Sequence, residues 1–475
     1  MPAPNKINYV GEFSVETIKL IVASRSEPLE LGGTAFQGLI LYEDIYEPVI
    51  DGQLLIQDSI NLTNYGPITG QEELILKIKT PTLNDPDKVI DFTDQPLMVK
   101  SISNKQKISE GVEGFMLNFC TRQVMKDRRT KVKKVLEGTY SEIVKTLLDL
   151  TGASNRHHFI EPTSGIKKLV THNEHPFNLI KQCAEKSVSA KNGSPTYCFF
   201  ENLRGFHFRT LDSMYAQKPV HKIEPKQAGK LMEGGQHNIG EELENILDFK
   251  LHSQTNTLVE TDKGTFGSEI VVWNMFNKSF SKNQYNMIAE HENEKNINHY
   301  QNPSGGDYCP FSETVDKEGI SFSEFPAKAM LTPVAVDAKG FDASFVNSMG
   351  TRNISFTDDR EILQRRTSQF RRLSANVLEV KIYGNMIISV GDVVTVSLPQ
   401  PMTVEKTMDE MTDKRNSGEY LVTHIRHDFS PGKQKKHDMQ IRLTKDSVKE
   451  KIVVQETTYP QTNMKCDLHE DLYEF

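Results

Sequence analysis

With 475 residues, the chain is too long for a single hydrophobic core, and the usual size of about 100 to 200 residues per domain predicts three or four domains. Hydrophobic residues make up 37% and charged residues 25%, a composition that excludes a fibrous or disordered chain. Its 56 Lys and Arg against 64 Asp and Glu give a net charge of -8, which argues against a dedicated nucleic-acid binder because affinity for phosphate comes largely from Lys and Arg.

No run approaches the roughly 20 apolar residues that cross a bilayer, and the first residues lack the pattern of a signal peptide, so we expect a protein that is made in the cytoplasm and stays there. The five cysteines are odd in number and widely spread. This spacing gives neither a disulfide framework nor a metal knuckle. We therefore expect free buried thiols and no cofactor.

The N-terminal quarter, residues 1–125, has the alternation of a β module. Apolar residues occupy every second position from Leu74 to Ile78 and again from Phe115 to Phe119. Such alternation is typical of strands with one buried and one solvated face. Turn residues separate the runs, which predicts an antiparallel barrel or sandwich.

A basic run follows this module, with Asp127 as its one acid. Alternation of charged and apolar residues around Val132 predicts an extended segment with several cations on one face. One interpretation is a solvated edge that resists aggregation. The other is an electrostatic contact with an acidic neighbouring subunit. The cations of this run are Arg122, Lys126, Arg128, Arg129, Lys131, Lys133 and Lys134.

Residues 126–235 change to the period of helices. The sequence Thr139-Tyr140-Ser141-Glu142 is a capping box, and it predicts a helix near 139–151. Pro176 fits the first turn of a second helix near 175–188, where a missing N–H costs nothing. Two aromatic runs around a short turn predict a β-hairpin near 196–211. Together these elements predict an α+β domain.

A second β module is predicted from 236–260 together with 374–450, because alternation returns in both segments. Between them, 261–373 has weak periodicity with scattered Asn, Gly and Pro, and we expect an irregular insertion that ends in a helix near 357–373. Acidic residues at the start of that helix and arginines toward its end match the helix dipole.

The C-terminal extension, 451–475, ends in alternating acidic and apolar residues. It is either a frayed end or a short peptide that docks on a partner and folds on binding. The apolar candidates for such a contact are Leu472, Tyr473 and Phe475.

No residue set predicts catalysis or metal binding. His172 and His175 straddle a loop-to-helix junction, and His291 lacks the second histidine of a zinc-protease motif. His424 and His427 lie three apart on a predicted strand, which places them on opposite faces. Phosphate loops and nucleophile signatures are missing from the sequence, so we expect a protein that is not an enzyme.

The order of these modules resembles the baseplate central hub proteins of contractile-tailed bacteriophages. The resemblance is carried by G-Q-L-L-I-Q-D followed by P-I-T-G-Q-E-E-L-I-L-K-I in the first module, and by G-D-V-V-T-V and G-E-Y-L-V-T-H-I-R-H in the second. Related barrels occur in the valine-glycine repeat spike proteins of type VI secretion. The fold class expected is α+β and mainly β, with two similar antiparallel β-barrels, an α+β domain between them and an irregular insertion in the second barrel.

The resemblance implies a homotrimeric structural hub in the tail baseplate of the virion, assembled in the host cytoplasm. Three chains with two barrels each would supply six modules that join a sixfold tail tube to a threefold spike. The implied partners are the tail tube protein, a trimeric spike or puncturing protein and the baseplate wedge proteins. DNA would pass through a channel without specific binding, and the net charge permits an acidic channel.

Three alternatives remain at this level. The first is a hub or spike component of a contractile injection or type VI-like secretion system, although the chain has no long repetitive β-helix. The second is a hub-associated cell-wall hydrolase, which would need paired acids or metal ligands. The third is a carbohydrate-binding β protein, which exposed tryptophan clusters would favour, but the chain has one Trp.

Overall fold

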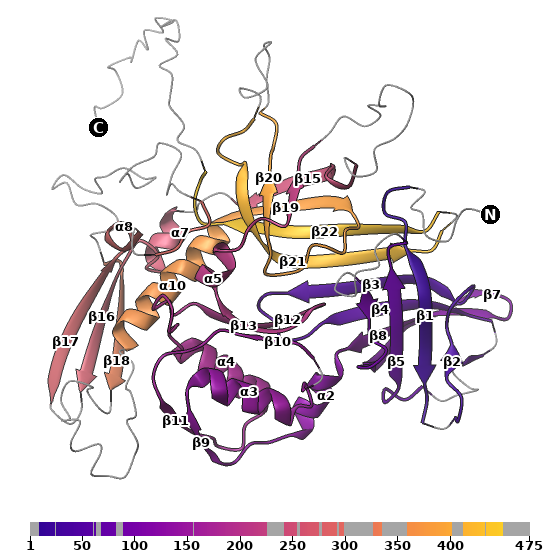
Figure 1. The fold of residues 1–475 in the computed structure, drawn as a ribbon, viewed down its shortest axis with the longest axis horizontal. Helices are drawn as coiled ribbons and strands as arrows, with labels where there is room; N and C mark the ends of the chain where they lie inside the picture. The colour runs from indigo at the N-terminus through magenta and orange to yellow at the C-terminus, as the bar shows by residue number, and fades with distance from the viewer. Residues whose placement is uncertain are drawn as a thin grey trace, which may run out of the picture.

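The computed structural model describes residues 9–23, 25–59, 61–62, 68–81, 89–154, 156–225, 242–253, 257–274, 278–291, 294–298, 326–334, 359–400, 412–432 and 434–449. The described chain is mainly β, and most strand pairs are antiparallel, as the alternating sequence predicts. One large sheet contains strands from both ends of the chain (Figure 1).

The N-terminal module comprises the strands that precede the basic run. Its core-facing residues alternate with polar ones, as in β5, where three aliphatic side chains are fully buried. Phe115 and Phe119 of β8 belong to the same core. The strands are β1 (Ser14–Ile21), β2 (Leu29–Glu30), β3 (Phe36–Asp44), β4 (Asp51–Asp58), β5 (Glu73–Lys79), β6 (Ile90–Asp91), β7 (Leu97–Ser109) and β8 (Val112–Cys120).

The α+β domain follows at once. Both predicted helices are confirmed: Thr139 and Glu142 form the expected capping box, and Pro176 begins its helix. The predicted hairpin is confirmed as β12 and β13. The elements are α2 (Arg122–Arg129), β9 (Val135–Gly138), α3 (Tyr140–Leu150), β10 (His158–Ile160), β11 (Lys167–Val170), α4 (Pro176–Lys186), β12 (Tyr197–Asn202), β13 (Gly205–Thr210) and α5 (Leu211–Tyr215).

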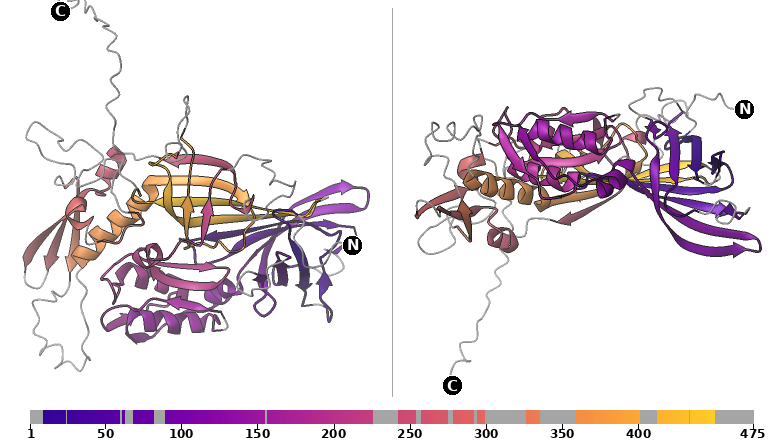
Figure 2. Two further views of the ribbon diagram at one scale, coloured as in Figure 1. Left: turned by 45° about the horizontal axis from the view of Figure 1, so that its top comes forward. Right: turned by 90° about the horizontal axis from the view of Figure 1, so that it is seen from below.

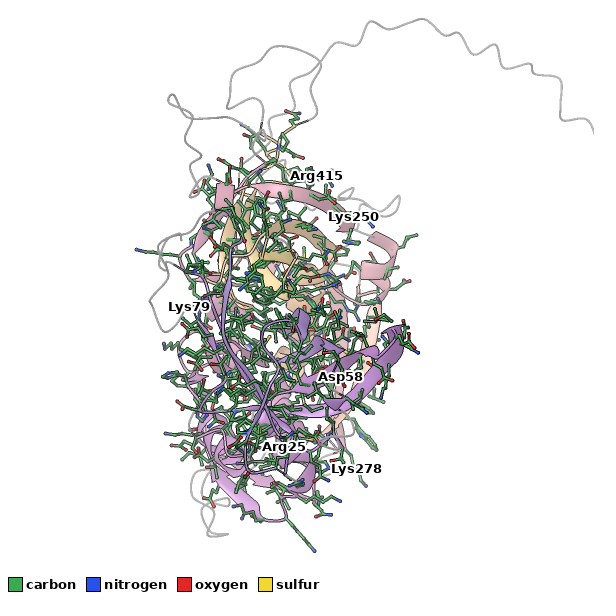
Figure 3. The ribbon with its side chains drawn as sticks, turned by 90° about the vertical axis from the view of Figure 1, so that its right-hand side faces the viewer. Arg25, Asp58, Lys79, Lys250, Lys278 and Arg415 are labelled. Atoms are coloured by element: carbon green, nitrogen blue, oxygen red, sulfur yellow. The ribbon has the colours of Figure 1, made fainter. Side chains whose placement is uncertain are left out.

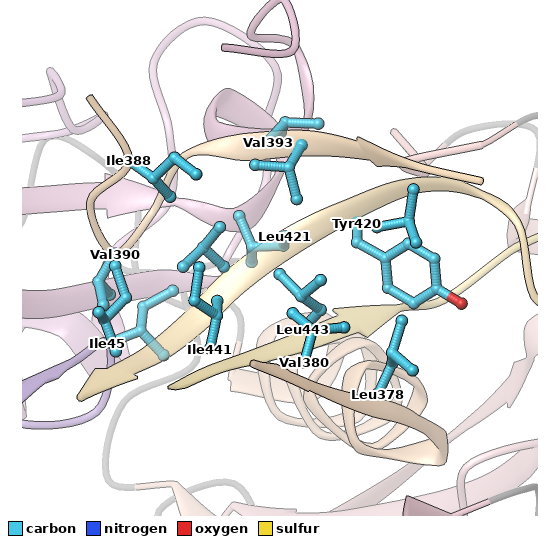
Figure 4. Packing of buried hydrophobic residues seen from close by; sticks show 14 of the residues in the cluster. Ile45, Leu378, Val380, Ile388, Val390, Val393, Tyr420, Leu421, Ile441 and Leu443 are labelled. Carbon is cyan, nitrogen blue, oxygen red and sulfur yellow. The ribbon is translucent and has the colours of Figure 1, made fainter. Parts of the chain in front are cut away.

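The C-terminal module begins before the second alternating region. Strand β14 lies inside the range 126–235, yet it pairs with β20 of this module. Buried residues of β19, β21 and β22 form the core of the module (Figure 4). The strands are β14 (His221–Ile223), β15 (Ile246–Ser253), β19 (Asn376–Tyr383), β20 (Val393–Val396), β21 (Gly418–Ser430) and β22 (Lys436–Lys445).

The insertion is not irregular where it is described, which corrects the sequence-based expectation. It contains a three-stranded sheet in the order β17-β16-β18, and α10 packs on that sheet. The sequence does not predict these strands because their outer face is partly apolar, which weakens the alternation of apolar and polar residues. Trp273 and Phe280 are exposed and stacked on that face. The elements are α7 (Thr257–Asp262), β16 (Gly267–Asn274), β17 (Ser279–Asn286), α8 (Met287–Glu290), β18 (Lys328–Val334) and α10 (Asp359–Ala375).

The α+β domain lies on one side of the large sheet, and the inserted sheet lies at one end of it with α10 between them (Figure 2). Arg366 of α10 fixes this arrangement by donating to the backbone carbonyls of Ala184, Pro195 and Tyr197 at 2.8–3.1 Å. Phe200 and Met214 of the α+β domain are buried in the C-terminal core. The domain is therefore packed against the C-terminal module rather than suspended beside it.

Neither β module closes into a barrel among the described strands. The strands instead follow one open path, β15-β19-β22-β21-β3-β4-β8-β7-β5-β1-β2, with β6, β14 and β20 attached beside it. The physical reason is that β3, which could close the N-terminal module on itself, pairs with β21 of the other module. In the N-terminal module, edge pairing with β21 therefore takes the place of closure. In the C-terminal module, a single bridge between Glu224 and Asn245 is the contact between the β14 side and the start of β15.

Candidate assembly site

Strand β21 is the element that joins the two modules. Its first half pairs with β20, from Leu421 back to Gly418, and its second half pairs with β3, from His424 to Phe429. The change occurs at a β-bulge between Val422 and His424 in the pairing with β22. A bulge bends a strand and increases its twist, so one edge of β21 can leave one partner and meet another. The backbone of Ile45 extends the contact by donating to the Thr423 carbonyl at 3.0 Å.

Three buried polar side chains are linked across the seam, by which we mean the β21–β3 pairing between the two modules. His427 Nε2 lies 3.0 Å from Glu43 Oε1, and His427 Nδ1 lies 3.1 Å from His437 Nε2. All three side chains are buried. Because a carboxylate only accepts, the chain is complete when His437 Nε2 donates to His427 Nδ1 and His427 Nε2 donates to Glu43. The second Glu43 oxygen accepts from the Leu203 backbone N–H at 3.4 Å, which brings in the α+β domain.

His437 is held tightly within this chain. Burial, together with the neighbouring His427, lowers the pKa of His437 well below its ordinary value, so the ring stays neutral. Its ring stacks on Phe429 with centroids 4.0 Å apart. Gly384 approaches from the other side, where a Cβ would lie only 1.9 Å from His437 Nδ1. The seam therefore requires a glycine at this position.

The opposite face of the sheet is polar across both modules. His424 pairs with Asp44 at 3.2 Å across the seam, which confirms that His424 and His427 point to opposite faces. Five carboxylates and five Lys or Arg side chains take part in the ion pairs of this face, so its paired charge is balanced rather than acidic. They are Asp44, Asp51, Glu379, Asp428 and Asp438 with Lys100, Lys381, Arg426, Lys436 and Arg442.

The hairpin β12–β13 clamps the α+β domain onto the C-terminal module. Arg204, at the hairpin turn, donates to both carboxylate oxygens of Asp392 at 2.9 and 2.7 Å and to the Ile387 carbonyl at 2.8 Å. Asn202 donates to the Val390 carbonyl at 3.0 Å. A bidentate guanidinium–carboxylate pair fixes orientation as well as distance. The domain thus holds a defined position on the shared sheet.

Two of the sheet edges that are free among the described residues also carry exposed apolar side chains. Strand β5 pairs only with the start of β7, at Leu97 and Met98, so residues 101–109 of β7 have one unpaired edge. Strand β15 pairs with β19 along one edge, and its other edge is contacted only at its start, where the Ile246 N–H donates to the Glu224 carbonyl at 3.1 Å. Apolar side chains are exposed at both places, with Ile108 61% and Phe249 41% accessible. Exposed strand edges with apolar side chains are places where another chain can pair.

The basic run is helical in its first part and extended around Val132, where the alternation predicts an extended segment. Arg122–Arg129 is the helix α2, because Asp127 turns inward and accepts from the Phe177 backbone N–H at 2.8 Å, which anchors the helix against α4. The extended prediction holds only around Val132, which is buried between exposed Lys131 and Lys133. The sequence pattern does not predict this helix, because Asp127, its buried acid, is of a residue type that usually lies on the surface.

The structure gathers most of the predicted basic residues at one place. Arg128 and Arg129 end α2, and Lys131, Lys133 and Lys134 follow directly and are exposed. Arg122 lies apart from them and pairs with Glu73 at 3.3 Å. The other predicted contacts, Leu472, Tyr473 and Phe475, lie outside the described residues.

Within the described part of the chain, no group of three His, Cys, Asp or Glu side chains could hold a metal ion. Burial raises the pKa of the Cys120 thiol to about 11 and the pKa values of Cys183 and Cys198 to about 12. These thiols are protonated and inert at neutral pH. None of the helices in this described part is long and apolar enough to cross a membrane.

No protein-family model matches the chain, and no curated protein matches its sequence. Solved structures do resemble it. They include a tail protein from Neisseria meningitidis MC58 (TM-score 0.49, 11% identity, 92% of this chain and 97% of that chain) and a 43 kDa tail protein of prophage MuSo2 from Shewanella oneidensis (0.48, 8%, 91% and 98%). A type VI secretion component from E. coli is also similar (0.39, 7%, 90% and 76%).

Proposed function

We propose that the chain is the structural central hub of a phage tail baseplate, a homotrimer that joins the sixfold tail tube to the threefold spike. The observation that carries this proposal is the single sheet that runs through both β modules by way of β21 and β3. A chain with two β modules side by side presents two similar units to a tube, and three copies present six.

The shared sheet also offers a way to close a ring. Eight strands, β15-β19-β22-β21-β3-β4-β8-β7, lie between the edge of β15 and the unpaired edge of β7. If β15 of one copy pairs with that edge of β7 in the next, these eight strands from each of three copies form a continuous wall. Closure would cover Ile108 and Phe249, which a single copy leaves in water.

In this assembly the polar face of the sheet lines the channel. Its ion pairs neutralise cations such as Arg426, which lies 3.1 Å from Asp428. A wall whose cations are already paired gives the phosphates of passing DNA little to bind. The tail tube protein would contact one end of the ring, the spike or puncturing protein the other, and wedge proteins the outside. The protein would then reside in the tail baseplate of the virion and act without catalysis.

The test is to place a charge at one edge of the sheet. Phe249→Lys puts an ammonium into the β15–β7 contact, and we expect it to prevent trimer formation while the monomer stays folded. Leu258→Lys is the matched control, because Leu258 is also an exposed apolar residue, at 76% accessibility, but lies on helix α7 away from the edge. Sedimentation velocity measures both variants. Equal association of the two variants would contradict the proposed ring.

A further inference from the structure

Exposed basic residues lie at the end of α2 and directly after it, and two exposed valines follow them. We call this the basic strip: Arg128, Arg129, Lys131, Lys133 and Lys134, followed by Val135 and its partner Val170. None of its five cations has an ion pair among the described residues. The acid within the run, Asp127, is buried and occupied by the Phe177 N–H. Asp127 acts electrostatically on Arg128, and the five exposed cations together form a positive patch that attracts an acidic partner.

The apolar end of the basic strip is unusual for a two-stranded sheet. Val135 of β9 and Val170 of β11 are direct neighbours in the antiparallel pair, and they are 51% and 52% exposed. Lys131, Lys133 and Val135 alternate with buried Val132 and face outward together. An occupant of this strip would therefore combine negative charge with apolar side chains at short spacing.

One segment of the same chain has that chemistry. Residues 466–475 carry no Lys or Arg, and four acids give the segment a charge of -4 against the five cations of the strip. Four apolar residues are interleaved with these acids. The acids are Asp467, Glu470, Asp471 and Glu474, and the apolar residues are Leu468, Leu472, Tyr473 and Phe475.

We propose that residues 466–475 dock on the basic strip, with the acids on the five cations and the apolar side chains on Val135 and Val170. The eighteen residues from Glu450 to Asp467 can span about 60 Å when extended. That reach is comparable to the diameter of about 60 Å of a compact sphere with a radius of gyration of about 23 Å, so it is long enough to reach the strip of the same copy or of an adjacent one. Docking would use free energy from charge pairing and apolar burial to order the segment.

Zero-length carbodiimide cross-linking tests this directly, because it joins a carboxylate to a lysine amine in contact with it. In the full-length protein at low salt, we expect the acids of 466–475 to be cross-linked to Lys131, Lys133 and Lys134. The comparison lysines are Lys250 and Lys278, which are exposed and lie well apart from each other (Figure 3). Addition of 0.5 M NaCl should abolish the cross-links, since screening then acts within about 5 Å.

The variant Lys131→Glu/Lys133→Glu should lower the yield of these cross-links about tenfold, measured at the remaining Lys134. The matched control Lys278→Glu/Lys295→Glu changes two exposed lysines outside β15, changes the net charge equally and should leave the yield unchanged. Mixing isotope-labelled and unlabelled copies shows whether the segment reaches its own strip or a neighbour's, and both results support the site. Cross-links spread evenly over Lys250, Lys278 and the strip, or a yield unaffected by Lys131→Glu/Lys133→Glu, would overturn the proposal.

Discussion

His427 and Glu43 are 384 residues apart in sequence, and their side chains lie 3.0 Å apart in a buried site between two β modules. The pair accompanies the backbone pairing of β21 with β3, and each module supplies one partner. The free energy that this pair contributes is therefore a measure of how strongly the two modules are held in one sheet.

Glu43→Ala should destabilise the protein by about 1–3 kcal/mol, because it leaves the His427 N–H buried without an acceptor. Glu43→Gln keeps an acceptor oxygen and should cost less. Glu47→Ala is the control, since Glu47 is 60% exposed in its pair with Lys181 and such pairs contribute less than about 1 kcal/mol. Chemical denaturation measures the three free energies of unfolding. Equal losses for Glu43→Ala and Glu47→Ala would show that the seam pair is unimportant.

The buried histidines predict acid sensitivity. Burial lowers the pKa of His207 to about 3 and the pKa of His437 well below its ordinary value. Below pH 6.5 the unfolded chain protonates both residues whereas the folded chain does not, so stability falls as the pH decreases. Each residue contributes a slope of about 1.4 kcal/mol per pH unit in that range.

His207→Phe removes one of these titrations and keeps a ring between Phe159 and Phe200, on which His207 stacks with centroids 4.5 and 4.8 Å away. Between pH 6.5 and 5, the slope of unfolding free energy against pH should decrease by about one proton relative to the original chain. Denaturation at four or five pH values measures it. An unchanged slope would mean that His207 is protonated in the folded state.

Gly384→Ala should cost about 1–3 kcal/mol because the added methyl overlaps the His437 ring and neither group can move freely. Gly32→Ala is the matched control, as a Cβ at Gly32 meets no atom within 4 Å. Thermal unfolding of both variants tests the prediction. If both behave alike, the packing between Gly384 and His437 is looser than described.

Arg204→Lys should not restore the clamp between the α+β domain and the C-terminal module, because an ammonium cannot bind both oxygens of Asp392 and the Ile387 carbonyl in one plane. We expect a loss of about 2 kcal/mol, close to that of Arg204→Ala. Arg426→Lys, in an exposed pair with Asp428, should change stability by less than about 0.5 kcal/mol. The rate of limited proteolysis at the hairpin β12–β13 provides an independent measurement of how well the α+β domain stays attached.

Local signals in the sequence predicted local structure well. The capping box at Thr139, the proline at 176 and the alternation around Leu76 each act within a few residues, and the structure contains the elements that they predict. The placement of His424 and His427 on opposite faces followed from strand geometry alone.

Long-range pairing could not be predicted in the same way. The local sequences of β3 and β21 do not indicate that these strands pair with each other instead of closing two barrels. Both strands have the same alternation of apolar and polar residues, which fits either partner. Glu43 looks like a surface residue by its charge, and its partners His427 and the Leu203 backbone N–H make its burial possible. The helix α2 was missed for a related reason, since the contact that orients Asp127 comes from α4.

The most direct test of the hub account is the mass of the assembled protein in solution. Native mass spectrometry over a range of concentrations should show a species at three times the 53.9 kDa chain mass, with no larger ring. This result would agree with three shared sheets closing edge to edge. A stable dimer as the end point of association would contradict the account, because two copies of an eight-strand wall cannot supply the six modules that the proposed adaptor needs.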